Sequence, residues 1–155
     1  MHGTASAEAA DVNVDSTIAR AATILLVDDD VELLKALTKV LEKENYEVIP
    51  QPDADSAIAY LNTARKKFDL VLTDVSMPGM KGTAFLSVVK NILPHIPVVV
   101  ITAFGDWGQY MDAVRSGAFE YLSKPLEKSE LLKVVRRALS NGTARNNHGA
   151  AVGAP

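Results

Sequence analysis

Short apolar runs alternate along this chain with longer segments in which apolar residues recur at helical spacing. An apolar run of about 4–8 residues is typical of a buried strand, whereas positions i, i+3 and i+7 mark one face of a helix. Strands that are apolar almost throughout suit a parallel sheet covered on both faces. The alternation therefore predicts five βα units in a doubly wound α/β domain. The predicted strands are residues 23–28, 46–50, 69–73, 97–101 and 119–122.

The predicted helices follow the strands. In the first, Leu34, Leu37 and Leu41 recur at i, i+3 and i+7 and predict one buried face. Asp53 is a favourable N-cap for the second helix, and Gly117 is a favourable residue for ending the fourth. The apolar positions of the later helices are Ala57, Ile58 and Leu61; Phe85, Val88, Val89 and Ile92; Trp107, Met111 and Val114; and Leu131, Leu132, Val135 and Leu139.

Composition changes sharply toward both ends of the chain. Residues 1–21 and 141–155 are rich in small and polar residues and poor in large apolar ones. Such composition does not bury enough apolar surface to fold by itself. We therefore expect a flexible leader at 1–21, one folded domain at 22–140 and a disordered tail at 141–155.

Charge and composition exclude several classes of function. A net charge of −3 gives no basic face for nucleic acid, so we expect no direct nucleic acid binding. The absence of cysteine excludes disulfides, thiol catalysis and cysteine metal sites. No apolar run approaches the ~20 residues of a membrane helix, and no secretory signal pattern opens the chain. We expect a cytoplasmic protein that does not enter the membrane.

Polar residues of matched chemistry follow the ends of four predicted strands. They are Asp28 and Asp29 after the first strand, Asp74 after the third, Thr102 after the fourth and Lys124 after the fifth. The carboxyl ends of parallel strands share one edge of a sheet, where ligands bind. These residues are therefore expected to converge on one site.

Three carboxylates at one edge repel each other, and burial increases the cost. A divalent cation would relieve this repulsion, and oxygen ligands without sulfur favour Mg²⁺, with Mn²⁺ or Ca²⁺ as substitutes. Lys124 can neutralise a developing anion, and Thr102 can donate a hydroxyl hydrogen bond. Asp74 is the natural nucleophile, because a carboxylate can form an aspartyl phosphate.

Four segments carry a resemblance to a known family. They are ILLVDDD (24–30), DLVLTDVSMPGMKG (69–82), VVVITAFGD (98–106) and GAFEYLSKP (117–125). In this order and spacing they resemble the receiver domain of two-component response regulators, and the last two are similar to receivers of nitrogen-regulator type. The resemblance covers about residues 22–140. It implies a chemotaxis-regulator-like, flavodoxin-like fold with strand order 2-1-3-4-5 and helices on both faces.

The resemblance also implies a metal centre. Asp28 and Asp29 would help hold Mg²⁺, with Asp29 usually the direct ligand. Asp74 would be both a metal ligand and the phosphoacceptor. The backbone carbonyl of Ser76 would supply another oxygen.

Further residues match positions that contact or respond to the phosphoryl group. Thr102 and Lys124 would contact it, and Thr102 would move toward it. Tyr121 matches an aromatic position that changes rotamer with phosphorylation, and Pro125 matches a proline often preceded by a cis peptide. Thr102 and Tyr121 would thus act as a switch for the surface of helix 4, strand 5 and helix 5.

Partners follow from the same resemblance. The phosphate donor would be a histidine kinase or a histidine phosphotransfer protein. The recipient of the signal would be a downstream protein target or an output domain absent from this chain. Such a module is not an enzyme for a separate substrate, although it catalyses its own phosphorylation and dephosphorylation. Homodimerisation through helix 4, strand 5 and helix 5 is common among such domains.

Two other functions fit parts of the pattern. In a small Mg²⁺-dependent phosphatase of the haloacid-dehalogenase type, Asp28 would be the nucleophile and Asp30 the acid/base, with Thr102 and Lys124 in later motifs. The chain is short for that family, and the Met77-Pro78-Gly79 turn after Asp74 would be unexplained. A flavin-binding fold of similar topology is the third hypothesis. For Asp30 we expect no role in the site and predict only that it starts a helix.

Overall fold

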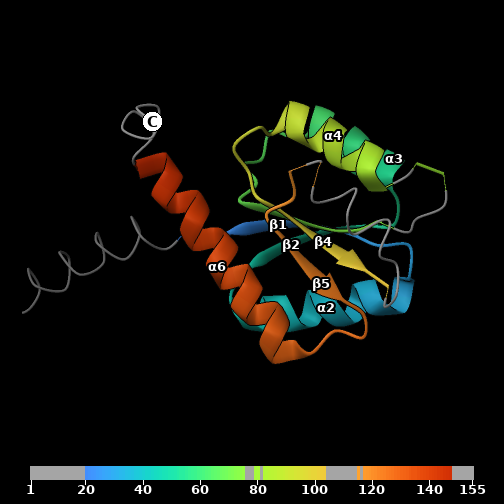
Figure 1. Cartoon of the computed structure of the whole chain (residues 1–155), viewed down its shortest axis with the longest axis vertical. Helices are drawn as coiled ribbons and strands as arrows, with labels where there is room; N and C mark the ends of the chain where they lie inside the picture. Colours follow the sequence, from blue (N-terminus) through green and yellow to red (C-terminus); the bar gives the residue numbers. More distant parts are fainter. Residues whose placement is uncertain (1–19, 76–78, 81, 104–114, 116, 148–155) are drawn as a thin grey trace, which may run out of the picture.

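Five parallel strands form the single sheet of the part of the chain that the structure describes. This computed structural model describes residues 20–75, 79–80, 82–103, 115 and 117–147. The strands lie in the order β2-β1-β3-β4-β5, as expected (Figure 1). Their bounds are β1 Thr23–Val27, β2 Glu47–Gln51, β3 Leu70–Asp74, β4 Val98–Thr102 and β5 Glu120–Ser123.

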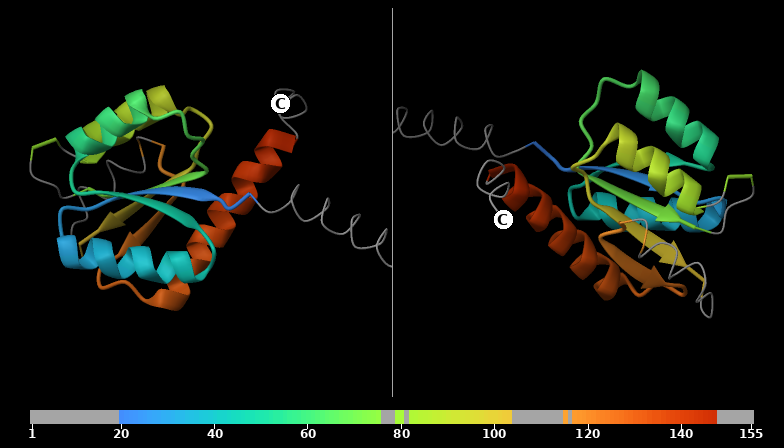
Figure 2. Two further views of the ribbon diagram at one scale, coloured as in Figure 1. Left: turned by 180° about the vertical axis from the view of Figure 1, so that it is seen from behind. Right: turned by 45° about the horizontal axis from the view of Figure 1, so that its top comes forward.

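Helices cover both faces of this sheet. In the described residues they are α2 Val31–Lys43, α3 Ala54–Thr63, α4 Gly82–Ile92 and α6 Lys128–Asn147. α2 and α6 lie on one face, and α3 and α4 on the other (Figures 1 and 2). The doubly wound fold predicted from the alternating pattern is therefore confirmed, while the predicted fourth helix, with Trp107, Met111 and Val114, lies outside the described residues.

Each face of the sheet has its own apolar core. In β1, Ile24 and Leu26 join the core under α2 and α6, whereas Leu25 and Val27 join the core under α3 and α4. All five residues of β1 are buried. Because successive side chains of a strand point to opposite faces, a strand covered on both sides must be apolar at every position. This explains the unbroken apolar runs in the sequence.

Carboxylates begin two of the helices. Asp30 accepts a hydrogen bond from the backbone N–H of Leu33 at 3.1 Å, and Asp53 accepts one from Ser56 at 2.7 Å. The backbone hydrogen bond from Ser56 lowers the pKa of Asp53. The predicted N-cap at Asp53 is thus confirmed. Gly117, expected to end the fourth helix, has φ +91°, a conformation that glycine adopts without strain.

The bounds differ from expectation in three respects. β1 ends at Val27, one residue before the predicted end at residue 28. Strands β2 to β5 each lie one residue further along the chain than predicted, because pairing continues to Asp74 opposite Ile101 and to Thr102 opposite Ser123. α6 continues to Asn147, past residue 140 where the folded unit was expected to end. A helix satisfies its backbone hydrogen bonds internally, so it can extend beyond the core that stabilises its first turns. None of the helices in the described part of the chain is long and apolar enough to cross a membrane.

Polar contacts tie the amino end of the sheet together. Asp69 accepts hydrogen bonds from the side chain of Arg20 and the backbone N–H of Thr23, both at 2.8 Å. Glu47 at the start of β2 pairs with Lys66 and accepts from the Thr23 hydroxyl. These contacts lie at the edge opposite the predicted site, so the fold separates a structural polar cluster from the candidate chemistry.

The α3–α4 core gives a test of the packing. Phe85 of α4 is fully buried, so we expect Phe85→Ala to lower the free energy of unfolding by about 3–5 kcal/mol. Asn91→Ala, at an exposed position of the same helix, should change it by less than about 0.5 kcal/mol. Urea denaturation measures both values. A loss below about 1 kcal/mol for Phe85→Ala would contradict this packing.

Candidate metal site at the carboxyl edge of the sheet

The predicted residues meet at the carboxyl edge of the sheet. Asp28 directly follows β1, Asp74 ends β3 and Thr102 ends β4. Lys124 follows β5, and its backbone N–H donates to the carbonyl of Thr102 at 2.8 Å. β1, β3, β4 and β5 are consecutive neighbours in the sheet, so residues far apart in sequence lie together. This confirms the proximity expected from the strand ends.

Three carboxylates form one compact acidic group. One carboxylate oxygen from each of Asp28, Asp29 and Asp74 can be chosen so that all three lie within 4.8 Å of one another. Asp28 is fully buried, Asp74 is 2% exposed and Asp29 is exposed. The group therefore has two ligands held inside the protein and one at its rim, which leaves an approach from solvent.

Lys124 bridges the two buried carboxylates. Its Nζ lies 3.0 Å from Asp74 Oδ2 and 3.3 Å from Asp28 Oδ2, and its side chain is only 27% exposed. Burial alone would lower the pKa of Lys124. Its hydrogen bond to Asp74 and the charges of Asp74 and Asp28 outweigh this effect, so the pKa lies above its usual value. Lys124 is thus a fixed cation in the site.

Asp28 remains electrostatically under-compensated. Burial raises the pKa of its carboxyl and the charge of Asp74 adds to the rise, against the opposing effects of the Asp30 N–H and Lys124. Oδ1 accepts the Asp30 N–H at 2.9 Å. Oδ2 is buried, and no well-directed hydrogen bond reaches it from the described residues. A buried acceptor in this state is costly, so the carboxylate set fits a hard divalent cation.

The remaining predicted residues have mixed outcomes. Thr102 is 4% exposed, and its hydroxyl donates to the carbonyl of Ala103 at 3.1 Å. Tyr121 is half-buried beside the α3–α4 core. The peptide bond between Lys124 and Pro125 is cis, as expected. Ser76 lies outside the described residues.

Three consecutive carboxylates have three different environments, and the predicted helix start at Asp30 is confirmed. Asp28, Asp29 and Asp30 are consecutive carboxylates, yet the first is buried, the second lies at the rim and the third caps α2. The hydrogen bond from the backbone N–H of Asp30 to the carboxylate of Asp28 was not predicted. The N-cap pattern at Asp30 was the available signal, because it places that N–H in a turn beside the end of β1.

Comparison with known proteins agrees with this geometry. A family model described as "Response regulator receiver domain" matches residues 24–136. The response regulator protein FleR of Pseudomonas aeruginosa is 41% identical over 117 residues, which are 76% of this chain and 24% of FleR. The DNA-binding transcriptional regulator NtrC of Azospirillum brasilense is 37% identical over 123 residues, 79% of this chain and 25% of NtrC. The matched part of this chain therefore spans about a quarter of the length of these curated relatives.

A solved structure shows the same fold. A response regulator receiver domain protein from Clostridium thermocellum superposes with a TM-score of 0.75 at 30% identity, covering 79% of this chain and 98% of the other. The family match, the strand order and the acidic edge all agree. The chain belongs to the response regulator receiver domain family of two-component signalling.

Proposed function

We propose that Asp74 accepts a phosphoryl group from a phosphohistidine donor and that this modification carries the signal. The observation that supports this most directly is the position of Lys124 Nζ, within 3.3 Å of carboxylate oxygens of both Asp28 and Asp74. A nucleophilic carboxylate beside a fixed cation and an acidic cation site is the arrangement that phosphoryl transfer requires.

Asp74 acts as the nucleophile. A side-chain oxygen of Asp74 attacks phosphorus, the P–N bond to the donor histidine breaks, and the imidazole leaves with its electron pair and takes up a proton. The product is an aspartyl phosphate. Lys124 already contacts Asp74 and is placed to neutralise charge on the phosphoryl oxygens. Water later attacks the aspartyl phosphate, releasing inorganic phosphate and restoring the carboxylate.

Asp28, Asp29 and Asp74 would hold Mg²⁺, and the carbonyl of Ser76 is a further proposed ligand. Mn²⁺ or Ca²⁺ would fit the same oxygen donors. When bound, the cation offsets the repulsion of the carboxylates and polarises the phosphoryl oxygens. Asp28, held by the Asp30 N–H, would be a buried ligand, and the exposed Asp29 would be a ligand on the solvent side.

Thr102 and Tyr121 are the proposed switch. The Thr102 hydroxyl donates to a neighbouring backbone carbonyl and would turn to the phosphoryl oxygens instead. Tyr121, half-buried on the adjacent strand β5, would move into the space behind it. A phosphoryl group adds charge and strong acceptors, which would favour one state of the helix 4, strand 5 and helix 5 surface.

The position of Asp30 argues against the haloacid-dehalogenase hypothesis. That mechanism needs Asp30 as acid/base, but the Asp30 carboxylate caps α2 through the Leu33 N–H. The family match likewise disfavours the flavin hypothesis. The partners would be a histidine kinase or phosphotransfer protein and, because the matched segment covers only about a quarter of each of these relatives, an output domain or protein target.

Intact-mass measurement tests the phosphoacceptor. Incubation with Mg²⁺ and acetyl phosphate should add one phosphoryl group to the native chain. Asp74→Asn removes the nucleophile and should abolish the added mass, as should a chelator. Asp53→Asn, which changes a carboxylate that caps α3 and does not belong to the group of Asp28, Asp29 and Asp74, should be labelled normally.

Two results would contradict the assignment. One is labelling that persists in Asp74→Asn. The other is turnover of phosphate esters that survives Asp74→Asn, which would favour the phosphatase. A native chain that stays unlabelled while a control receiver is labelled would contradict the proposed function as a whole.

The buried Asp28 predicts an unusual dependence of stability on pH. Its native pKa is raised, so the native state binds more protons than the unfolded state between the unfolded pKa of about 4 and the native pKa. Its contribution to stability therefore falls as pH rises through that window and stays low at pH 7. In a chelator, Asp28→Asn should unfold at higher urea than the native chain at pH 7, and this advantage should vanish toward pH 4.

Mg²⁺ should reverse the order of stability, so that the native chain unfolds at higher urea than Asp28→Asn. Binding to the native chain stabilises it by about 1.4 kcal/mol for each tenfold rise in Mg²⁺ above the dissociation constant. Asp28→Asn should gain much less, because it has lost one ligand charge. Equal Mg²⁺ stabilisation of the two proteins, measured by urea denaturation at pH 7, would rule out Asp28 as part of the cation site.

A further inference from the structure

Asp30 connects the first turn of α2 to the acidic group. Its carboxylate accepts the backbone N–H of Leu33 at 3.1 Å, and its carbonyl accepts the backbone N–H of Leu34 at 2.9 Å. Its own backbone N–H donates to Asp28 Oδ1 at 2.9 Å. The residue that begins the helix therefore also holds one oxygen of the buried carboxylate.

The hydrogen bond from Asp30 fixes the direction of the Asp28 carboxylate. The terminal torsion of an aspartate side chain has broad energy wells, so a bond to one oxygen decides where the other points. Oδ1 is engaged by the N–H, whereas Oδ2 is buried and lies 3.3 Å from Lys124 Nζ. The N–H of Asp30 therefore leaves Oδ2 on the side where the three carboxylates meet.

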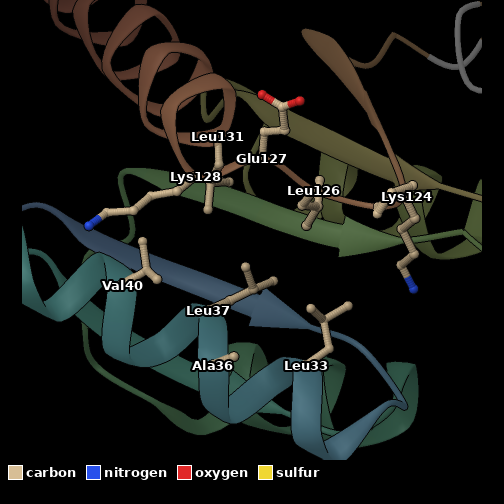
Figure 3. Close-up of a pocket in the computed structure, with 10 residues that line it drawn as sticks. Leu33, Ala36, Leu37, Val40, Lys124, Leu126, Glu127, Lys128 and Leu131 are labelled. Carbon is tan, nitrogen blue, oxygen red and sulfur yellow. The ribbon is translucent and has the colours of Figure 1, made fainter.

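Apolar packing secures the first turn of α2 only in part. Leu33 is half-buried against the core under α2 and α6, and it faces the segment that carries Lys124 across a groove of about 370 Å³ (Figure 3). Val31, the first residue of the helix, is 51% exposed. The first N–H groups of a helix have no partners within it, and helix ends with little buried surface open readily. The closed state of this turn therefore depends on the Asp30 cap.

We propose that Asp30 is a positioning residue for the cation site: its cap keeps the first turn of α2 closed, and the closed turn holds Asp28 in the orientation that binds Mg²⁺. The inference rests on the proposed function, which requires that cation. Opening of the turn moves the Asp30 N–H away from Asp28, and the apparent affinity falls with the fraction of protein that remains competent. Asp30 acts through Asp28 and does not contact the ion.

Cation binding must stabilise the turn by the same factor by which the closed turn raises affinity. Mg²⁺ should therefore slow amide hydrogen exchange at Leu33 and Leu34, whose N–H groups bond to the cap, by about threefold or more. The first turn of α3 is a matched control, because Asp53 accepts the N–H groups of Ser56 and Ala57 in the same pattern. Exchange at these two amides, measured by NMR in the same sample, should not respond to Mg²⁺.

Substitutions at Asp30 separate the cap from the charge. Asn and Ser cap helices about as well as Asp, whereas Ala does not, and loss of a cap shifts a helix start by about fivefold. In an NMR titration of the full chain at physiological salt, Asp30→Ala should raise the Mg²⁺ dissociation constant about threefold to fivefold. Asp30→Asn and Asp30→Ser should stay within about twofold of the native value, because exposed charges are screened. Asp53→Ala, which removes the same kind of cap from α3, should leave the constant unchanged.

Acetyl phosphate labelling gives a second measurement. Asp30→Ala should need about three to five times more Mg²⁺ for half-maximal labelling of Asp74. Its maximal rate should equal that of the native chain, because a saturating cation holds the turn closed. Asp53→Ala should show the native Mg²⁺ dependence, which separates positioning of Asp28 from a general loss of stability.

Four results would overturn the inference. They are native Mg²⁺ affinity in Asp30→Ala, an equal loss in Asp30→Asn and Asp30→Ser, an equal loss in Asp53→Ala, and unchanged exchange at Leu33 and Leu34 when Mg²⁺ is added. A native chain that neither binds Mg²⁺ nor becomes labelled would reject the proposed function together with this role of Asp30. Normal Mg²⁺-dependent labelling of the native chain and of Asp30→Ala alike would reject only the positioning role.

Discussion

The contact between one ammonium group and two buried carboxylates is the interaction on which this molecule's chemistry depends. Lys124, whose side chain is 27% exposed, reaches Asp28 and Asp74, whose carboxylates are almost wholly removed from solvent. Removing charges from water costs free energy that a single ion pair seldom recovers in full. The two apolar cores on either side of the sheet provide stability against which that cost is set. The buried carboxylate of Asp28 is therefore incompletely compensated, which favours added positive charge at this edge of the sheet.

Much of this arrangement was predictable because the fold imposes strong constraints on sequence. A strand covered on both faces must be apolar throughout, so the runs before Asp28, Asp74 and Thr102 were visible as strands. Parallel strands end at one edge, so the residues that follow them converge. The sequence did not separate Asp28 from Asp29, because which of two adjacent carboxylates is buried depends on backbone direction after β1. Strand bounds were one residue out for β2 to β5, because ladder pairing rather than side-chain type decides where a strand ends.

A groove between α2 and the segment after β5 was not predicted, for a related reason. Leu33 and Val40 line this groove and are only half-buried, because the segment after β5 leaves space between itself and α2. Residues about ninety positions apart in the sequence form the two walls of this groove, so no local sequence pattern indicates it. Lys124 lies in the groove and in the acidic site at once.

The length of α6 has a mechanical consequence. The helix packs on the core as far as Leu139, while Ser140 and Asn141 are exposed and the ribbon continues past the sheet to Asn147 (Figure 2). Arg137 fastens it to Glu120, the residue before Tyr121, at 3.0 Å. A 20-residue helix is about 30 Å long, so a tilt of about 5° at one end displaces the other by about 2.6 Å. A small tilt of α6 is therefore enlarged toward Asn147, beyond the part of the helix that packs on the core.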